Sequence, residues 1–321
     1  MLKIKVNLDN HSYNNLINDM KLFSIIKKDS TINKNKFINL LFENLYEDYI
    51  SNINLIKNKS KTILNKYNVK DDSLLSELSV SLFEFNSSSQ EEYFNKSLIF
   101  YLNDKNEMIF NDLVDTLKYE SYSLFFRKLI YHYLSFPQYK RDQIIHKEVF
   151  DLLNRGINES KIVKVKLINN KVEELLPYKL DTSKEEVYTY VIGKVRKTEI
   201  TSIKLSKIKS VFLTSNIFKF SKGEISLFEE IIKCGIQFPC NELTDAEIIL
   251  SERGVELFNR KFLNKPTPIK IEGNHYFFRC SYNQLFVFFI SFAKHIDIIS
   301  PESLRKDFIN MYTPFIKKKS Q

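Results

Sequence analysis

Cations and aromatic rings are interleaved in one stretch of the chain, between Pro177 and Leu213. Lysine and arginine neutralise phosphate, and tyrosine rings offer flat faces on which bases stack. Together these side chains suit a ligand that combines phosphate with a base. The residues concerned are Lys194, Arg196, Lys197, Lys204, Lys207 and Lys209, with Tyr178, Tyr188 and Tyr190 nearby.

The positive charge of the chain is concentrated around this stretch. The formal net charge is +9, and the segment from Arg155 to Ile225 has 15 basic and 8 acidic residues, a surplus of 7. A local basic patch is a better sign of a polyanionic ligand than a high isoelectric point. Lysines on strands are often merely solvated, so a β-module with a basic face in water is the alternative.

Short strands must position these side chains. Between residues 187 and 192, β-branched and aromatic side chains alternate, and Gly193 then permits a bend or the close approach of another backbone. Two β-rich runs follow between Ile200 and Phe212, and residues 169–171 separate two earlier runs as a tight hairpin turn. The pattern predicts antiparallel strands in a small barrel or curved sheet over residues 154–225.

The same stretch resembles the WYL domain of bacterial regulators. The resemblance is carried by Pro177-Tyr178, by Thr189-Tyr190-Val191 at the position that names the family, and by the run from Thr201 to Ile208. Lysines stand where the family has arginines, which keeps the charge without the planar two-pronged donor group. The resemblance implies an Sm/SH3-like β-barrel that binds a nucleotide or nucleic acid. It implies ligand contacts by Tyr178, Tyr190, Arg196, Thr201, Ser202, Lys204 and Lys207.

Residues 1–55 show a different pattern. Polar and apolar side chains alternate over residues 2–8, which predicts a strand with one cationic face and one buried face. Two amphipathic helices follow, and the second has Asn33 or Asn35 as its N-cap. A lone strand would leave its edges unpaired, so we expect it to pair with a strand of another molecule.

This order resembles the ribbon-helix-helix fold, in which two chains pair their strands into one ribbon that enters the major groove of DNA. The resemblance implies a homodimer whose base-facing residues are Lys3, Lys5 and Asn7. It also implies phosphate binding at the N-terminus of the second helix, near Asn33, Lys34 and Asn35. The alternative is a strand that joins a larger sheet, with a helical hairpin behind it.

The rest of the chain is expected to connect and extend these parts. Residues 56–153 are interpreted as a helical connector, with short helices at 63–69, 74–85, 91–102, 110–117, 122–134 and 138–153. Residues 226–321 are predicted to form a separate α+β domain with a β-α-β-β-α order. This domain is similar to half of a ferredoxin-like fold and to the extension that follows many WYL modules, which implies a role in dimerisation or in framing the ligand.

Several functional classes lack support in the sequence. The three cysteines, Cys234, Cys240 and Cys280, have neither the spacing of a zinc site nor that of a disulfide framework, which favours a reducing compartment. No phosphate-binding glycine loop and no hydrolase motif is found, so we expect no enzyme, no metal and no cofactor. No signal peptide or membrane-spanning run is recognised, so a cytoplasmic protein without membrane contact is expected.

The sequence therefore predicts an α+β protein in four parts, namely ribbon-helix-helix, helical connector, WYL barrel and ferredoxin-like extension. We expect a homodimeric regulator that binds operator DNA through the ribbon and senses a nucleotide or single-stranded nucleic acid through the WYL module. The alternative is an accessory protein that binds single-stranded RNA and stimulates the RNA-guided RNA nuclease of a type VI CRISPR system. In that case the partner would be a CRISPR effector.

Overall fold

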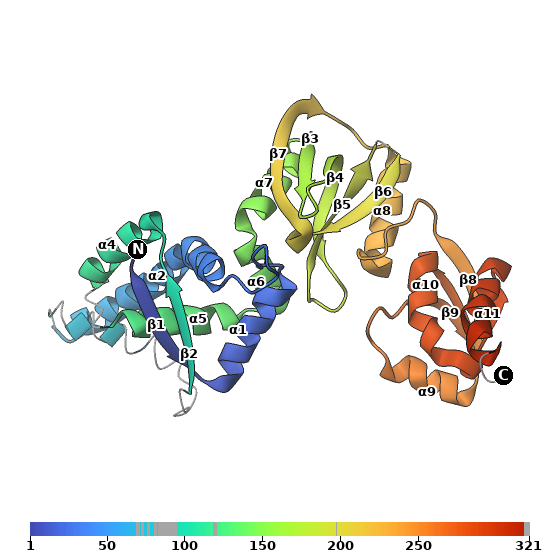
Figure 1. Cartoon of the computed structure of the whole chain (residues 1–321), viewed down its shortest axis with the longest axis horizontal. Coiled ribbons are helices and arrows are strands. Elements are labelled where there is room, and N and C mark those ends of the chain that lie inside the picture. The colour runs from blue at the N-terminus through green and yellow to red at the C-terminus, as the bar shows by residue number, and fades with distance from the viewer. Residues whose placement is uncertain are drawn as a thin grey trace. The chain divides into compact units, whose positions relative to one another are not determined.

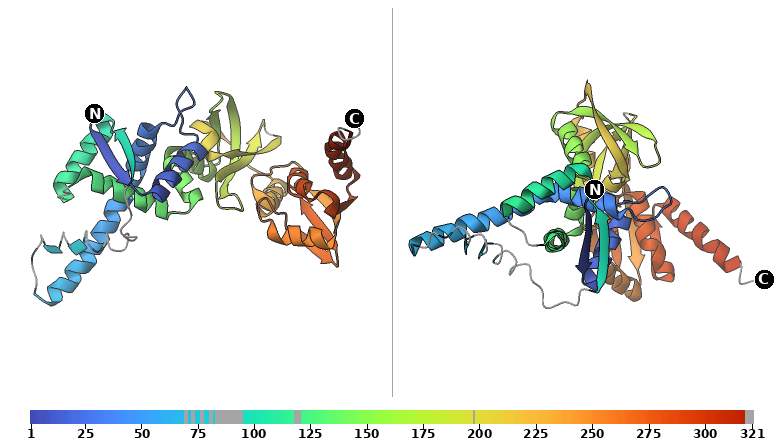
Figure 2. Two further views of the ribbon diagram at one scale, coloured as in Figure 1. Left: turned by 60° about the horizontal axis from the view of Figure 1, so that its bottom comes forward. Right: turned by 60° about the vertical axis from the view of Figure 1, so that its left-hand side comes forward.

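The computed structural model describes residues 1–68, 71, 74–75, 78–79, 82, 95–117, 121–196 and 198–317 (Figures 1 and 2). Lys197 and most of the helix predicted at 74–85 lie outside these ranges. The chain divides into two compact units, Met1–Lys147 and Glu148–Gln321. No helix in the described ranges combines the length and the hydrophobicity needed to cross a bilayer.

The first unit combines a two-stranded sheet with helices. Its strands are β1 (Lys3–Leu8) and β2 (Lys96–Tyr101). Its helices are α1 (Asn10–Leu22), α2 (Lys34–Lys66), α4 (Asp104–Leu117), α5 (Tyr122–Ser135) and α6 (Gln138–Ile145). The N-caps of α1 and α2 are Asp9 and Asn33, whose side chains accept hydrogen bonds from backbone N–H groups of the first turn.

The strand β1 has its partner within the same chain. It pairs antiparallel with β2, from Lys3 opposite Tyr101 to Leu8 opposite Lys96, and the two strands lie side by side in Figure 2. The expectation that β1 requires another molecule is therefore wrong. The helix predicted at 91–102 is also wrong in its described part, because an unbroken apolar run over residues 98–102 conceals the period of two.

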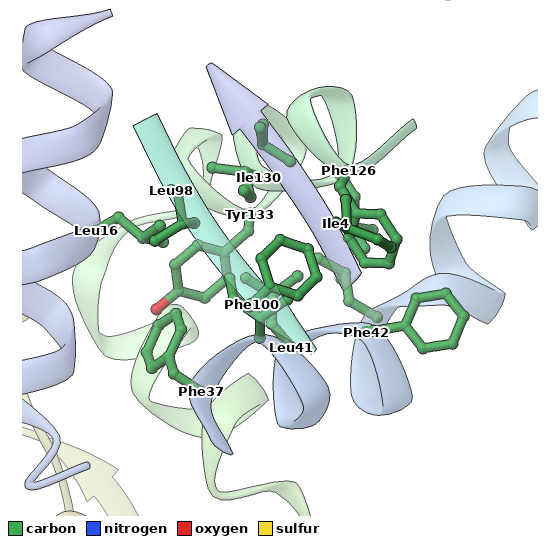
Figure 3. Packing of buried hydrophobic residues seen from close by; sticks show 14 of the residues in the cluster. Ile4, Leu16, Phe37, Leu41, Phe42, Leu98, Phe100, Phe126, Ile130 and Tyr133 are labelled. Atoms are coloured by element: carbon green, nitrogen blue, oxygen red, sulfur yellow. The ribbon is translucent and has the colours of Figure 1, made fainter. Parts of the chain in front are cut away.

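Both strands turn one face to a shared hydrophobic core (Figure 3). Figure 3 shows side chains from β1, β2, α2 and α5 gathered in one cluster, among them Ile4, Phe100, Phe42 and Phe126. All four are 3% exposed or less. Since burying one side chain of this size contributes about 1.5–3 kcal/mol, this core holds the two strands in one unit.

A buried ion pair joins three helices of this unit. Asp19 on α1 is fully buried, and its carboxylate accepts hydrogen bonds from the Tyr133 hydroxyl at 3.0 Å and from Nη2 of Arg141 at 3.2 Å. Nε of Arg141 lies 2.9 Å from Oδ2 of Asp19, the same oxygen that accepts from Tyr133. Burial raises the pKa of Asp19, and the charge of Arg141 acts against that rise.

The second unit begins with α7 (Lys147–Asn158) and a five-stranded antiparallel sheet with the order β6-β5-β4-β3-β7. The strands are β3 (Lys161–Leu167), β4 (Val172–Thr182), β5 (Thr189–Val195), β6 (Glu199–Lys204) and β7 (Ile208–Ile217). The 3-10 turn η1 (Leu205–Lys207) joins β6 to β7. The hairpin predicted around residues 169–171 is confirmed, because β3 and β4 pair directly.

Gly193 sits where β5 passes close to β4. A Cβ atom at this position would lie 2.2 Å from the carbonyl oxygen of Leu176 and 3.0 Å from Cα of Pro177. Both atoms belong to the backbone of β4, so neither can rotate away. The close backbone approach predicted for Gly193 is confirmed.

One helix covers the outer face of this sheet. It is α8 (Lys222–Gly235), which begins with a capping box formed by Ser221 and Glu224. Phe228 and Ile231 of α8 form a small core with Ile192 of β5. Because α8 lies on this face, it limits the access of a ligand to the predicted ligand residues of the same face.

A four-stranded antiparallel sheet with the order β11-β8-β10-β9 completes the second unit. Its elements are β8 (Thr244–Leu250), α9 (Glu252–Arg260), β9 (Pro268–Glu272), β10 (His275–Cys280), α10 (Tyr282–Phe289), η2 (Ile290–His295), β11 (Ile296–Ser300) and α11 (Glu302–Lys317). Before the final helix α11 the element order is β-α-β-β-α-β, one strand more than predicted. The α+β class, with several small antiparallel sheets, is confirmed.

Candidate nucleic-acid interface

The predicted base-facing residues lie on the outer face of the two-stranded ribbon. Lys3, Lys5 and Asn7 are exposed, and the residues between them are buried, so the predicted alternation along β1 is confirmed. Among the described residues, no acidic side chain forms an ion pair with Lys3 or Lys5. These ammonium groups therefore keep their charge available for a phosphate or a base edge.

The second strand contributes half of this face, which the sequence did not predict. The outward residues of β2 are exposed: Tyr101 lies opposite Lys3, Ile99 opposite Lys5, and Ser97 opposite Asn7. Lys96 at the start of β2 is also exposed. The outer face of the two strands carries two lysines, Lys3 and Lys5, and no acidic residue, because Lys96 lies opposite the buried Leu8. The available sequence signal was Leu98, Phe100 and Leu102, which match the apolar positions of β1.

The N-terminus of α2 meets the end of this ribbon. Asn33 uses its side chain to cap the helix, accepting from the backbone N–H of Lys36 at 3.0 Å. Lys34 donates to the Tyr13 hydroxyl at 3.3 Å. Asn35 accepts from the backbone N–H of Tyr101 at 3.3 Å. The structure thus brings Asn35 to the ribbon at the Lys3 end, while these contacts occupy the side chains of Asn33 and Lys34.

The predicted ligand residues of the five-stranded sheet are divided between its faces. Tyr190 pairs with Lys204 and Ile192 with Ser202, so these residues share the outer face that α8 covers. Thr201 pairs with Gly193 and points to the opposite, inner face. The ammonium group of Lys204 lies over the ring of Tyr188, a favourable contact between a cation and an aromatic face.

Acidic residues of α8 hold two members of the basic and aromatic set. Lys194 contacts the Glu224 carboxylate at 2.5 Å, and this hydrogen bond lowers the pKa of Glu224 to about 2. The Tyr178 hydroxyl donates to Glu229 at 2.7 Å, and its ring stacks on Phe228 with centroids 4.6 Å apart. Burial, with the help of Glu229, raises the pKa of Tyr178 to about 12. Tyr178 therefore packs against α8, and Phe228 covers one face of its ring.

The remaining predicted residues lie elsewhere on this sheet. Arg196 is exposed in the turn between β5 and β6, where its φ of 52° lies in the left-handed region. Lys207 is exposed on η1 and lines a shallow hollow of about 430 Å³ with Leu167, Ile168 and Asn169. Arg196 and Lys207 are thus at the two ends of β6, not in one pocket.

Comparisons with known proteins place the fold. No family model and no curated protein matches the chain. A solved structure described as a CRISPR Cas-related protein matches with a TM-score of 0.69 at 13% identity, over 99% of this chain and 94% of that one. Proteasome accessory factor B/C of Arthrobacter aurescens overlaps with 50% of this chain and 26% of its own, at a TM-score of 0.22 and 13% identity. The chain therefore shares its fold, nearly end to end, with the CRISPR Cas-related protein.

Proposed function

We propose that the protein is a nucleic-acid-binding regulator that contacts operator DNA through the outer face of its β1–β2 ribbon. The observation that carries this proposal is the exposed lysine face of β1, on a ribbon whose inner face is buried in the core of the first unit. A two-stranded ribbon fits the major groove, and its lysines release condensed counterions from the phosphates they approach. The N-terminus of α2, which lies at one end of the ribbon, adds backbone N–H donors for a phosphate.

The arrangement of the other two parts agrees with this interpretation. A helix followed by five antiparallel strands in the order β7-β3-β4-β5-β6 supports an Sm-like barrel of the WYL type. The β-α-β-β-α-β order of the C-terminal part supports a ferredoxin-like extension. We propose that the barrel senses a nucleotide or single-stranded nucleic acid at Lys204 and its neighbours Tyr190 and Ser202. A ligand can bind there only if α8 moves away from the sheet, because that helix covers the same face.

The test of the DNA proposal is a salt titration of duplex binding. The Lys3→Ala/Lys5→Ala variant should weaken duplex binding at least about tenfold. The plot of log K against log salt has a negative slope, and the variant should make it less steep by about 2. The matched control exchanges two exposed lysines of the other unit that lie away from β9, Lys294→Ala/Lys306→Ala, and should leave the slope unchanged. Equal affinity of wild type and the β1 variant would refute the proposal.

A second candidate is favoured by the match over almost the whole chain to a CRISPR Cas-related protein. In this case the protein would bind single-stranded RNA and stimulate an RNA-guided RNA nuclease of type VI. A competition between single-stranded RNA and duplex DNA, with and without Lys204→Ala and Lys207→Ala, distinguishes the two. A preference for RNA that these barrel variants abolish would favour the accessory role.

We propose further that the protein forms a homodimer through the C-terminal sheet. The ribbon needs no second chain, because β1 pairs with β2. The strand β9, however, is an edge strand with two exposed isoleucines, Ile269 at 66% and Ile271 at 52%. A second copy that pairs antiparallel about Ile271 would set Lys270 against Glu272 of that copy, which matches opposite charges. Exposed apolar edges of this kind favour strand addition.

A further inference from the structure

We infer that one chain carries both halves of the DNA-reading ribbon, and that this ribbon fits an asymmetric duplex site with thymine methyl groups under β2. The inference rests on the proposed function, because it specifies the partner of the same surface. Its basis is an internal duplication, in which β2, α4 and α5 repeat the structure of β1, α1 and α2.

The first helices of the two halves begin in the same way. Leu8 ends β1 and is followed by Asp9, whose carboxylate accepts from the N–H of Ser12 at 2.7 Å. Leu102 follows β2 and precedes Asn103, whose side-chain oxygen accepts from the N–H of Asn106 at 2.8 Å. In both cases a buried leucine comes directly before a residue that caps the helix from three positions upstream.

The first part of α2 also corresponds to α5, position by position. Asn33 caps α2 through the N–H of Lys36, and Ser121 caps α5 through the N–H of Leu124. The buried positions then coincide at an offset of 88. They are Phe37, Ile38, Leu41, Phe42 and Leu45 in α2, and Phe125, Phe126, Leu129, Ile130 and Tyr133 in α5.

In each half, a side chain of the second helix donates a hydrogen bond to the backbone of the other half's strand, and the two donors occupy equivalent positions. Nδ2 of Asn39 on α2 donates to the carbonyl of Tyr101 on β2 at 2.9 Å. Nε of Arg127 on α5 donates to the carbonyl of Asn7 on β1 at 2.9 Å. Asn39 and Arg127 correspond at the offset of 88, and Asn7 and Tyr101 occupy the same place before their helix caps. The two halves are therefore interlaced about an approximate twofold axis, as two separate chains would be.

The outer face does not share this symmetry. Lys5 and Ile99 occupy the central pair, so an ammonium group on one strand stands where the other has a branched alkyl chain. Tyr101 corresponds to Asn7, and Ser97 to Lys3. Ile99 is 44% exposed and Tyr101 is 37% exposed, although both lie on a face otherwise formed by polar residues.

The bases in the major groove present both polar groups and methyl groups, which a face with one polar half and one partly apolar half can distinguish. Lysine donates to the acceptors of guanine and asparagine pairs with adenine, whereas the 5-methyl group of thymine is read by apolar contact. The β1 half fits purine edges, and Ile99 with the ring of Tyr101 fits thymine methyl groups. Two unlike half-faces read two unlike half-sites, so the best site of one ribbon is not a palindrome.

The experiment uses the full-length protein and a pool of random 20-base-pair duplexes at low ionic strength, from which the bound sequences are selected. The selected duplex then serves as the probe, alongside copies with deoxyuridine in place of thymine, which lack only the methyl group. We expect a non-palindromic consensus. We also expect about a fourfold loss of affinity for each contacted methyl group removed, the value of one buried carbon.

Variants separate the two halves. Ile99→Ser should bind more weakly and should become insensitive to deoxyuridine at the affected positions, whereas Lys3→Ala/Lys5→Ala should bind more weakly and stay sensitive. The matched control is Ile309→Ser, an exposed isoleucine on α11 of the other unit, which should behave as wild type. Circular dichroism checks that each variant folds.

The outcomes are distinguishable. A consensus that is palindromic within the site of one ribbon, or wild-type binding that is indifferent to both deoxyuridine and Ile99→Ser, overturns the inference while the proposed DNA function stands. Failure of the wild type to bind any duplex overturns both. A non-palindromic consensus together with an Ile99-dependent methyl effect supports the inference.

Discussion

Replacing Gly193 by alanine should open the five-stranded sheet locally. The added Cβ would lie 2.2 Å from the carbonyl oxygen of Leu176, and contacts below 3.0 Å require atoms to move. The obstacle is the backbone of β4, so β4 and β5 must separate and their hydrogen bonds must lengthen. Overpacking of this kind costs about 1–3 kcal/mol, and the upper end applies because no side chain can rotate away.

The assay is hydrogen exchange followed by mass spectrometry on peptides that cover residues 172–195. A loss of about 2–3 kcal/mol in local stability corresponds to exchange that is about 30-fold to 150-fold faster in the variant. Peptides from the first unit should exchange at the wild-type rate, because that unit has its own core.

The matched control is Gly223→Ala. Gly223 lies in the first turn of α8, and a Cβ there would meet no atom within 4 Å. Alanine favours helix by about 0.4–1 kcal/mol over glycine, so this variant should slow exchange in α8 slightly. If Gly193→Ala exchanges like wild type over 172–195, the close approach of the two strands is wrong.

Three further predictions concern stability and assembly. Arg141→Met leaves the Asp19 carboxylate buried without its cation and should cost about 3–5 kcal/mol in urea unfolding; because the pKa of Asp19 then rises further, the loss should be smaller at pH 5 than at pH 8, and an equal loss at both would contradict this. Glu224→Gln should remove stability that wild type has above the usual carboxyl pKa of about 4.5 and loses as the pH falls towards about 2, so melting temperatures of the two proteins should converge in acid. Ile271→Lys should shift the protein from dimer to monomer in sedimentation velocity, and an unchanged sedimentation coefficient would exclude β9 as the interface.

Parts of the fold were accessible from sequence because their signals are local. Exposed and buried residues alternate along the strand at residues 3–8, and Asn33 is a typical N-cap for the helix that follows. The turn at 169–171 lies between two period-two runs. Gly193 was correctly predicted as a place of close backbone approach. In each case a few neighbouring residues decide the conformation.

The errors arose where the decisive partner is distant in sequence. Ile99 and Tyr101 make β2 apolar on both faces, so its period of two disappeared, and with it the partner of β1. Tyr178 looked like a stacking platform because nothing nearby in sequence shows that Phe228 will cover it. Pro268 concealed β9, although proline is compatible with an edge strand.

For the proposed DNA-binding function, the pairing of β1 with β2 also bears on how the occupancy of a DNA site responds to protein level. A reader assembled from two chains is subject to a monomer–dimer equilibrium, so at low abundance its active fraction falls with dilution. A ribbon whose halves are joined by peptide bonds forms at any abundance, so the occupancy of a site by one such ribbon follows protein concentration in a simple hyperbola. Covalent linkage also allows each half of the ribbon to acquire substitutions separately. In a homodimer, by contrast, a substitution appears in both strands.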